Sequence, residues 1–234
     1  MLILLAPSKT MDFETPVTIK STEPRFLKQA NSLAASLAKL SESELAKLMK
    51  ISPKLATENY ERYQSFPKAT SKPALFAYQG DVYRDIHPQN YTDSQLQFAQ
   101  EHLRILSGLY GILRPLDAIK PYRLEMSIQK NSWKPYLTEA INAENPNYII
   151  GLSSKEYLSP INFRQTKAPL INCHFKTGDR IIPIFSKIAR GTMANFIVTH
   201  QLTKPEELKD FTDDGWKFES KQSDDSNFVF VRKK

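Results

Sequence analysis

LRILSGLYGILRPLDAIKPYRLEM, residues 103–126, is the stretch on which the predicted fold depends. Its leucine-rich beginning continues the spacing of a preceding amphipathic helix, so we expect a helix that ends at Gly108. A turn over residues 109–111 follows. The chain then runs extended, because Arg114 and Lys120 each precede a proline and such residues disfavour the helical conformation.

Three arginines, Arg104, Arg114 and Arg123, lie among apolar residues of this stretch that are typical of a core. If the leucines of this segment are packed in the core, the arginines at its edges are held in fixed positions. We therefore expect it to form one wall of a basic cleft for a phosphate-rich partner. Internal ion pairs are the alternative, because Asp117 and Glu125 are close in sequence.

Composition and net charge limit the classes of protein to which the chain can belong. The chain has 234 residues, a net charge of +7 and a pI near 9.3. Such an excess favours polyanions, nucleic acid first and an anionic membrane surface or phosphorylated small molecules after it, although a merely soluble basic protein fits as well. One cysteine excludes an intramolecular disulfide. The first residues carry too short an apolar run for a signal peptide or a membrane span, so we expect a cytoplasmic protein.

Apolar runs typical of strands alternate along the chain with capping residues and amphipathic spacing typical of helices. Strands are expected at residues 2–5, 73–78, 148–152, 170–175, 180–185, 215–220 and 227–232, the fourth and fifth joined as a hairpin. Helices are expected at 24–40, from Ser41, from Ser52, from Thr92 to Gly108, over 133–141 with Ser132 as cap, and over 186–201. Cys173 is expected in the core.

Residues 41–66 predict two short helices joined by a tight connection. Ser41 and Glu44 form a capping box at the start of the first helix. Ser52 followed by Pro53 supplies a hydroxyl N-cap and a proline at the first position of the second helix.

This stretch resembles a helix-hairpin-helix DNA-binding motif, which in generic form reads L-x-x-L-P-G-I-G-x-x-x-A-x-x-I-x-x-x-R. In such a hairpin the turn amides and the following helix N-terminus point at a backbone phosphate. Lys50 and Ser52 stand where the motif has its two glycines, which weakens the case for close backbone approach. Lys50, Ser52, Lys54 and Arg62 can still contact phosphate. An ordinary αα-hairpin packed on the core is the other interpretation.

Lys187 and Arg190 indicate a second phosphate site. They share one face near the expected start of the helix over residues 186–201. Cations at a helix N-terminus oppose the helix dipole, so the placement costs stability unless an anion is bound.

Four motifs together resemble the YaaA family of peroxide stress resistance proteins over essentially the whole chain. They are APSKT at residues 6–10, GDVY at 80–83, the block at 103–126, and KIARGTMANFI at 187–197. The resemblance implies one compact α/β (mixed α+β) domain over residues 1–234, with a mixed central sheet, flanking helices and a helix-hairpin-helix element at about 41–66 beside a basic cleft. It implies that the cleft is lined by Lys9, Arg104, Tyr110, Arg114, Arg123, Lys187 and Arg190.

The resemblance also implies DNA binding and a role in limiting free iron, and so oxidative DNA damage, under peroxide stress. Basic residues without a recognisable base-reading helix fit recognition of DNA backbone or shape. The alternative is an enzyme acting on nucleic acid or a phosphorylated small molecule in the same cleft. We expect no cofactor and no metal site, because the histidines lack ligand spacing. No nucleophile–base pair is identifiable, so a binding protein is the preferred hypothesis, and no membrane partner is expected.

Overall fold

The computed structural model describes residues 1–233. Its strands are β1 Leu2–Leu5, β2 Thr10–Met11, β3 Lys72–Pro73, β4 Tyr78–Gln79, β5 Leu103–Ser107, β6 Gly111–Leu113, β7 Ala118–Ile119, β8 Ile149–Leu152, β9 Leu170–Thr177, β10 Lys217–Phe218 and β11 Asn227–Arg232. Its α-helices are α1 Leu27–Leu37, α2 Glu42–Met49, α3 Pro53–Ser65, α4 Ala74–Ala77, α5 Asp93–His102, α6 Met126–Ala143, α7 Lys155–Leu158 and α8 Pro183–His200.

A seven-stranded mixed sheet in the order β10-β11-β9-β8-β1-β5-β6 forms the centre of this α/β domain. The five strands from β11 to β5 are parallel, and β10 and β6 add antiparallel edges. Because parallel strands end at the same edge, the segments after β1, β5 and β8 emerge together. Open α/β sheets bind ligands at this carboxyl edge.

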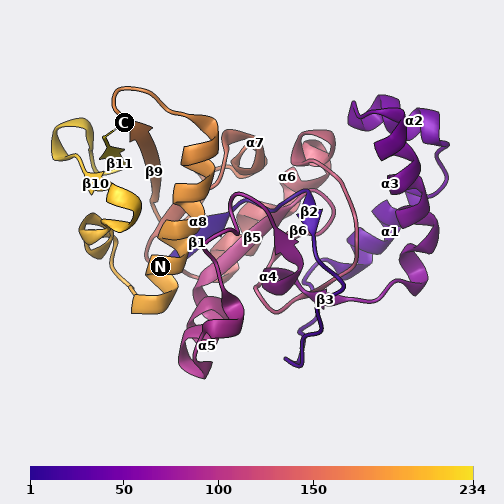
Figure 1. The fold of residues 1–234 in the computed structure, drawn as a ribbon, viewed down its shortest axis with the longest axis horizontal. Helices are drawn as coiled ribbons and strands as arrows, with labels where there is room; N and C mark the ends of the chain where they lie inside the picture. The colour runs from indigo at the N-terminus through magenta and orange to yellow at the C-terminus, as the bar shows by residue number, and fades with distance from the viewer. Residues whose placement is uncertain (234) are drawn as a thin grey trace.

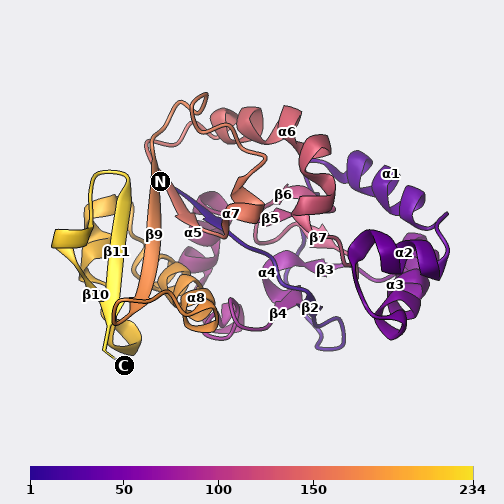
Figure 2. The ribbon, with the colours of Figure 1, turned by 90° about the horizontal axis from the view of Figure 1, so that it is seen from above.

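Helices cover both faces of the sheet. Helix α8 lies on one face and α6 on the other, as Figures 1 and 2 show. Ile3 and Leu5 of β1 belong to the core on the α8 side, whereas Leu2 and Leu4 belong to the core on the α6 side. Helices α1, α2 and α3 lie at one end of the long axis, and β9, β10 and β11 at the other (Figure 1).

The start of α5 and the expected strands at the centre and C-terminus are confirmed. The capping box at Thr92 has the Gln95 amide donating to the Thr92 hydroxyl and the Thr92 amide to the Gln95 side chain. Strands β1, β8 and β11 coincide closely with the expected runs. Cys173 is 3% exposed, as expected for a core residue.

The expected helix up to Gly108 is wrong in its second half. Helix α5 ends at His102, and residues 103–107 are strand β5, paired with β1 and β6. All five residues are buried, with Leu103 and Ile105 facing one core and Leu106 the other. An apolar run that is buried on both faces has no period of its own, so its neighbours decide its conformation.

Two expected strands are also wrong. Residues 74–77 form the single helical turn α4, whose first amides donate to the carbonyls of Asp117 and Pro115. Residues 180–185 form no strand with β9; β9 pairs with β8 and β11 instead, and α8 begins at Pro183. Helix α6 begins at Met126 and runs through Pro135, so Ser132 is not its cap.

Candidate functional site

The hairpin between α2 and α3 has the predicted local structure. The Glu44 amide donates to the Ser41 hydroxyl at 3.3 Å, and the Leu55 amide donates to the Ser52 hydroxyl at 3.4 Å. Lys50 ends α2 with φ 52° and ψ 51°. It therefore takes up the left-handed conformation for which glycine is normally required.

The apolar side of the hairpin packs on the domain, and its turn faces solvent. Leu45 and Tyr63 are buried, and the Tyr63 hydroxyl donates to the Arg123 carbonyl at 2.6 Å. Arg62 bends back toward α3, donating to the Asn59 side chain at 3.2 Å. The hairpin is thus attached to the segment that follows β7.

Lys50, Ser52 and Lys54 are exposed at this turn. Among residues 1–233, no carboxylate lies within 4 Å of either lysine ammonium group. At the start of α3, Pro53 has no amide hydrogen, and the Leu55 and Ala56 amides donate to Ser52, so the Lys54 amide is the one left without a partner among the described residues. The turn therefore offers the Lys54 amide and two uncompensated charges to an anion.

At the carboxyl edge of the sheet, Glu125 pairs with two cations. Its Oε1 atom lies 2.9 Å from Lys9 Nζ and 3.2 Å from Arg123 Nη2. Its Oε2 atom and the Arg123 Nε atom are buried without a hydrogen-bond partner among the described residues. Each atom therefore retains a free acceptor or donor position in a desolvated place, which favours a bound polar molecule or water.

Buried tyrosines lie next to the cluster of Lys9, Arg123 and Glu125. The Tyr122 hydroxyl hydrogen-bonds to Tyr78 and to Ser107, both at 2.6 Å, and burial raises the pKa of Tyr122 to about 12. A cavity of about 10 Å³, enough for one water, lies between Tyr122, Tyr157 and the Lys9–Glu125 pair. The phenols thus remain neutral near pH 7.

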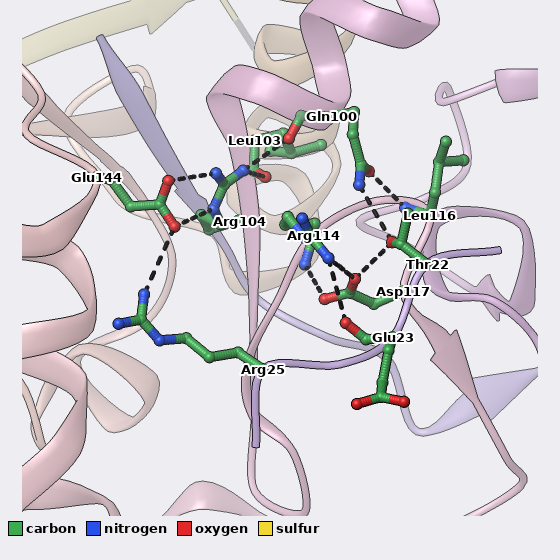
Figure 3. A network of polar contacts seen from close by, with 10 residues as sticks. All are labelled: Thr22, Glu23, Arg25, Gln100, Leu103, Arg104, Arg114, Leu116, Asp117 and Glu144. Carbon is green, nitrogen blue, oxygen red and sulfur yellow. Dashed lines mark hydrogen bonds and ion pairs between the residues drawn. The ribbon is translucent and has the colours of Figure 1, made fainter. Parts of the chain in front are cut away.

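Arg104 and Arg114 belong to a different network, drawn in Figure 3. Arg104 Nη2 lies 2.8 Å from Glu144 Oε2, and Arg104 Nη1 donates to the carbonyls of Gln100 and Leu103. Arg114 pairs with the buried Asp117 at 3.0 Å. Both arginines stabilise the fold through these partners.

Tyr110 is 1% exposed, and its hydroxyl accepts a hydrogen bond from the Lys120 amide at 3.0 Å. Burial raises the pKa of Tyr110. The phenol is therefore a buried, neutral group that is held by the Lys120 backbone.

Helix α8 carries Lys187 and Arg190 in a different position from the one expected. Because α8 starts at Pro183, Lys187 follows the first turn and Arg190 lies further on, so the dipole argument does not apply. Lys187 is exposed. Arg190 is half-buried, its Nε atom has no partner within residues 1–233, and burial lowers its pKa. Gly191 allows α8 to pack directly against the Val82 carbonyl.

The structure therefore distributes the expected residues over four places. Lys50, Ser52, Lys54 and Arg62 lie on the hairpin, Lys9 and Arg123 at the sheet edge, Arg104 and Arg114 in the Glu144–Asp117 network, and Lys187 and Arg190 on α8. Tyr110 lies on the side of the sheet-edge group, with its ring centre 5.5 Å from that of Tyr122. The Arg104–Arg114 cavity, of about 460 Å³, shares no residue with the cavity beside Lys9.

A further ion pair, between Lys72 and Asp12, was not predicted from the sequence. Their atoms lie 3.0 Å apart in the wall of a cavity of about 1000 Å³ that also contains Asp81. Hydrogen bonds from Thr15, together with Lys72, lower the pKa of Asp12. The two partners are sixty positions apart in the sequence, so no local pattern indicates their pairing. Within residues 1–233, no three His, Cys, Asp or Glu side chains are grouped to hold a metal, and no helix is long and apolar enough to span a membrane.

Comparison with known proteins identifies the family. The family model described as "Peroxide stress protein YaaA" matches residues 1–222. A UPF0246 protein of Rickettsia bellii (strain OSU 85-389) is 42% identical over 249 residues, covering 99% of this chain and 100% of the relative. A UPF0246 protein of Saccharophagus degradans is 39% identical over 255 residues, covering 100% of both chains. With a family model matched over nearly its whole length and relatives at this identity, the chain belongs to the peroxide stress protein YaaA family, also called UPF0246.

Proposed function

We propose that this member of the peroxide stress family binds DNA through its phosphate backbone, with the α2–α3 turn as the principal contact. The observation that carries the proposal is the pair of exposed lysines, Lys50 and Lys54, that have no carboxylate partner beside the start of α3. The Lys54 amide, the helix dipole and the two cations all favour a phosphate at this point.

The ion pairing of the other cations supports this choice of surface. Lys9, Arg104, Arg114 and Arg123 each have a carboxylate within 4 Å, so their charge is already compensated. A cation that is free to release DNA counterions contributes more to binding than one that must first leave a carboxylate. The hairpin and the start of α8 are therefore the stronger anion-binding surfaces.

Fluorescence anisotropy with a labelled 20-base-pair duplex tests the proposal. Between about 50 and 200 mM salt we expect affinity to fall steeply and to depend little on sequence. The K50A/K54A variant should weaken binding to every sequence and reduce the slope of log K against log salt by about 1.8, or 0.9 per lost phosphate contact. Lys130→Ala, which removes an exposed lysine from α6, is the matched control. Salt-independent binding, or equal slopes for the double variant and the control, would contradict the proposal.

The stress role that we propose is a reduction of iron-dependent DNA damage by covering DNA. Supercoiled plasmid exposed to Fe(II) and hydrogen peroxide should be nicked less in the presence of the protein, and K50A/K54A should lose this protection. Free Fe(II), measured with a chromogenic chelator, should be the same with both proteins. Protection that persists in a variant unable to bind DNA would show that another mechanism acts.

Glu125 supports a second candidate, an enzyme acting on nucleic acid or a phosphorylated small molecule. It lies between two cations at the carboxyl edge of the sheet, with one buried oxygen unpartnered by the described residues. Such a carboxylate can act as a general base or orient a substrate donor. Incubation with nucleotides and structured DNA, with and without divalent metal, tests this function. Turnover that is lost in Glu125→Gln would establish it.

A further inference from the structure

Three large apolar side chains are exposed together where α8 begins. Ile181, Ile184 and Phe185 are exposed to 54%, 50% and 37%. We call them the 181–185 patch. The other large exposed apolar residues of the described chain, Leu48, Tyr136 and Tyr148, are far from this patch in sequence and from one another. A local concentration of this kind marks a contact surface.

Phe185 is the residue of the patch with a defined packing partner. Pro183 occupies the first position of α8, and the Arg232 guanidinium lies 4.2 Å from the centre of the Phe185 ring. Arg232 also lies 4.8 Å from the ring of Trp216, which is 1% exposed, and its Nε donates to the Thr177 hydroxyl. Phe185 therefore packs against a half-buried guanidinium that contacts Trp216 and Thr177, so its ring loses little conformational entropy when the patch is covered.

Positive charge borders the patch. Arg180 precedes it and Lys187 follows it, and both are exposed. Neither they nor Arg190 has a carboxylate within 4 Å among residues 1–233. Asp179 is the one acidic residue between Lys176 and Arg190. An occupant must therefore combine negative charge with flat or apolar surface.

We infer that the 181–185 patch contacts unstacked bases of DNA, with Ile184 as the wedge and Arg180 and Lys187 on the flanking phosphates. This rests on the proposed DNA binding and adds the kind of DNA that is preferred, namely duplex with unpaired or easily unstacked steps. Apolar side chains that enter base steps beside cations are a general way to hold distorted DNA.

An anionic membrane fits less well, because membrane-surface helices present a wide apolar face along their length. The inward face of α8, with Ala189, Met193 and Ile197, is already buried against the sheet. The patch lies toward the β9–β11 end, whereas α2 and α3 lie at the other end (Figure 1). DNA contact at both places would give an extended footprint.

Two DNA duplexes of the same length test the inference, one fully paired and one with a two-nucleotide mismatch bubble that contains 2-aminopurine. Wild-type protein should bind the bubble at least about fivefold more tightly, because a bubble removes much of the unstacking cost that an apolar wedge must otherwise overcome, and should increase 2-aminopurine fluorescence as the base unstacks. Ile184→Ser should abolish both effects and leave binding to the paired duplex nearly unchanged. Tyr148→Ser, which removes an exposed apolar side chain where β8 begins, is the matched control and should retain both.

The outcomes separate the two proposals. Equal binding of bubble and duplex by wild-type protein, or an Ile184→Ser variant that keeps the bubble preference, overturns the wedge and leaves backbone binding intact. Binding of neither DNA at low salt overturns the proposed function itself. Flotation with phosphatidylserine vesicles that is lost in Ile184→Ser, without any bubble preference in wild type, would assign the patch to a membrane instead.

Discussion

Replacement of Lys50 by glycine separates the two properties of the hairpin turn, its conformation and its charge. Lys50 holds φ 52°, a conformation that costs a residue with a Cβ atom about 1 kcal/mol or more relative to glycine. Lys50→Gly relieves this strain, and Lys50→Ala keeps it. Both variants remove the same charge from an exposed position that has no ion pair among the described residues.

The magnitude follows from this difference. Glycine gains about 1–2 kcal/mol from the left-handed conformation and loses about 0.5–1 kcal/mol to the greater entropy of the unfolded chain. Lys50→Gly should therefore be about 1 kcal/mol more stable than Lys50→Ala. For a chain of this length, that difference corresponds to a Tm higher by about 2–4 °C.

Circular dichroism at 222 nm during heating measures the stability difference, and anisotropy in a salt series measures DNA binding. We expect the two variants to lose affinity to a similar extent, with slopes lower by about 0.9, because each lacks one phosphate contact. A Tm for Lys50→Gly at or below that of Lys50→Ala would refute the strain argument. Wild-type affinity in Lys50→Gly would show that backbone approach at the turn matters more than the lysine charge.

Three further predictions concern an ion pair, two carboxylates and the buried cysteine. Asp12→Asn should lower the unfolding free energy by about 3 kcal/mol in urea titrations, because it leaves the buried Lys72 ammonium unpaired; Lys72→Met in the same background should recover much of the loss, and no recovery would contradict the pairing. Hydrogen bonds lower the folded-state pKa of Asp12 and of Asp85, the latter mainly through Arg84. Their stabilisation is therefore present above the unfolded pKa of about 3.9 and is lost as the pH falls below it. Urea midpoints from pH 6 to pH 3 should show this decline, and Asp12→Asn should flatten it; an unchanged pH profile would refute the assignment. Burial raises the pKa of the Cys173 thiol to about 12, so iodoacetamide at pH 8 should label it in urea but not in the native protein, and rapid native labelling would contradict its burial.

Ion pairing also changes how the block at residues 103–126 is interpreted. Its arginines were expected to converge on one cleft, but Arg104 and Arg114 are held by Glu144 and Asp117 (Figure 3). The internal ion pairs that the sequence left open as an alternative are thus present for both. Part of the positive charge in this block therefore serves to stabilise the fold through internal ion pairs.

Local signals in the sequence determined the helix starts around the hairpin. The capping box at Ser41 and the Ser52–Pro53 pair act within one helical turn, and both appear in the structure where they were predicted. The exposed Lys50 and Lys54 follow from these starts, because the turn between two amphipathic helices faces solvent. This part of the candidate site was therefore predictable, whereas the left-handed conformation of Lys50 was not predicted and is a finding of the structure.

The tertiary structure alone decided the rest. Residues 103–107 carry no distinguishing period, and they become a strand because β1 and β6 supply backbone partners on either side. Glu144 compensates Arg104 across forty residues, and the unpaired oxygen of Glu125 at the sheet edge depends on where three strands end. Backbone pairing between strands and charge compensation by ion pairs are contacts between segments that are distant in sequence. They form only when the chain folds, so local sequence spacing cannot predict them.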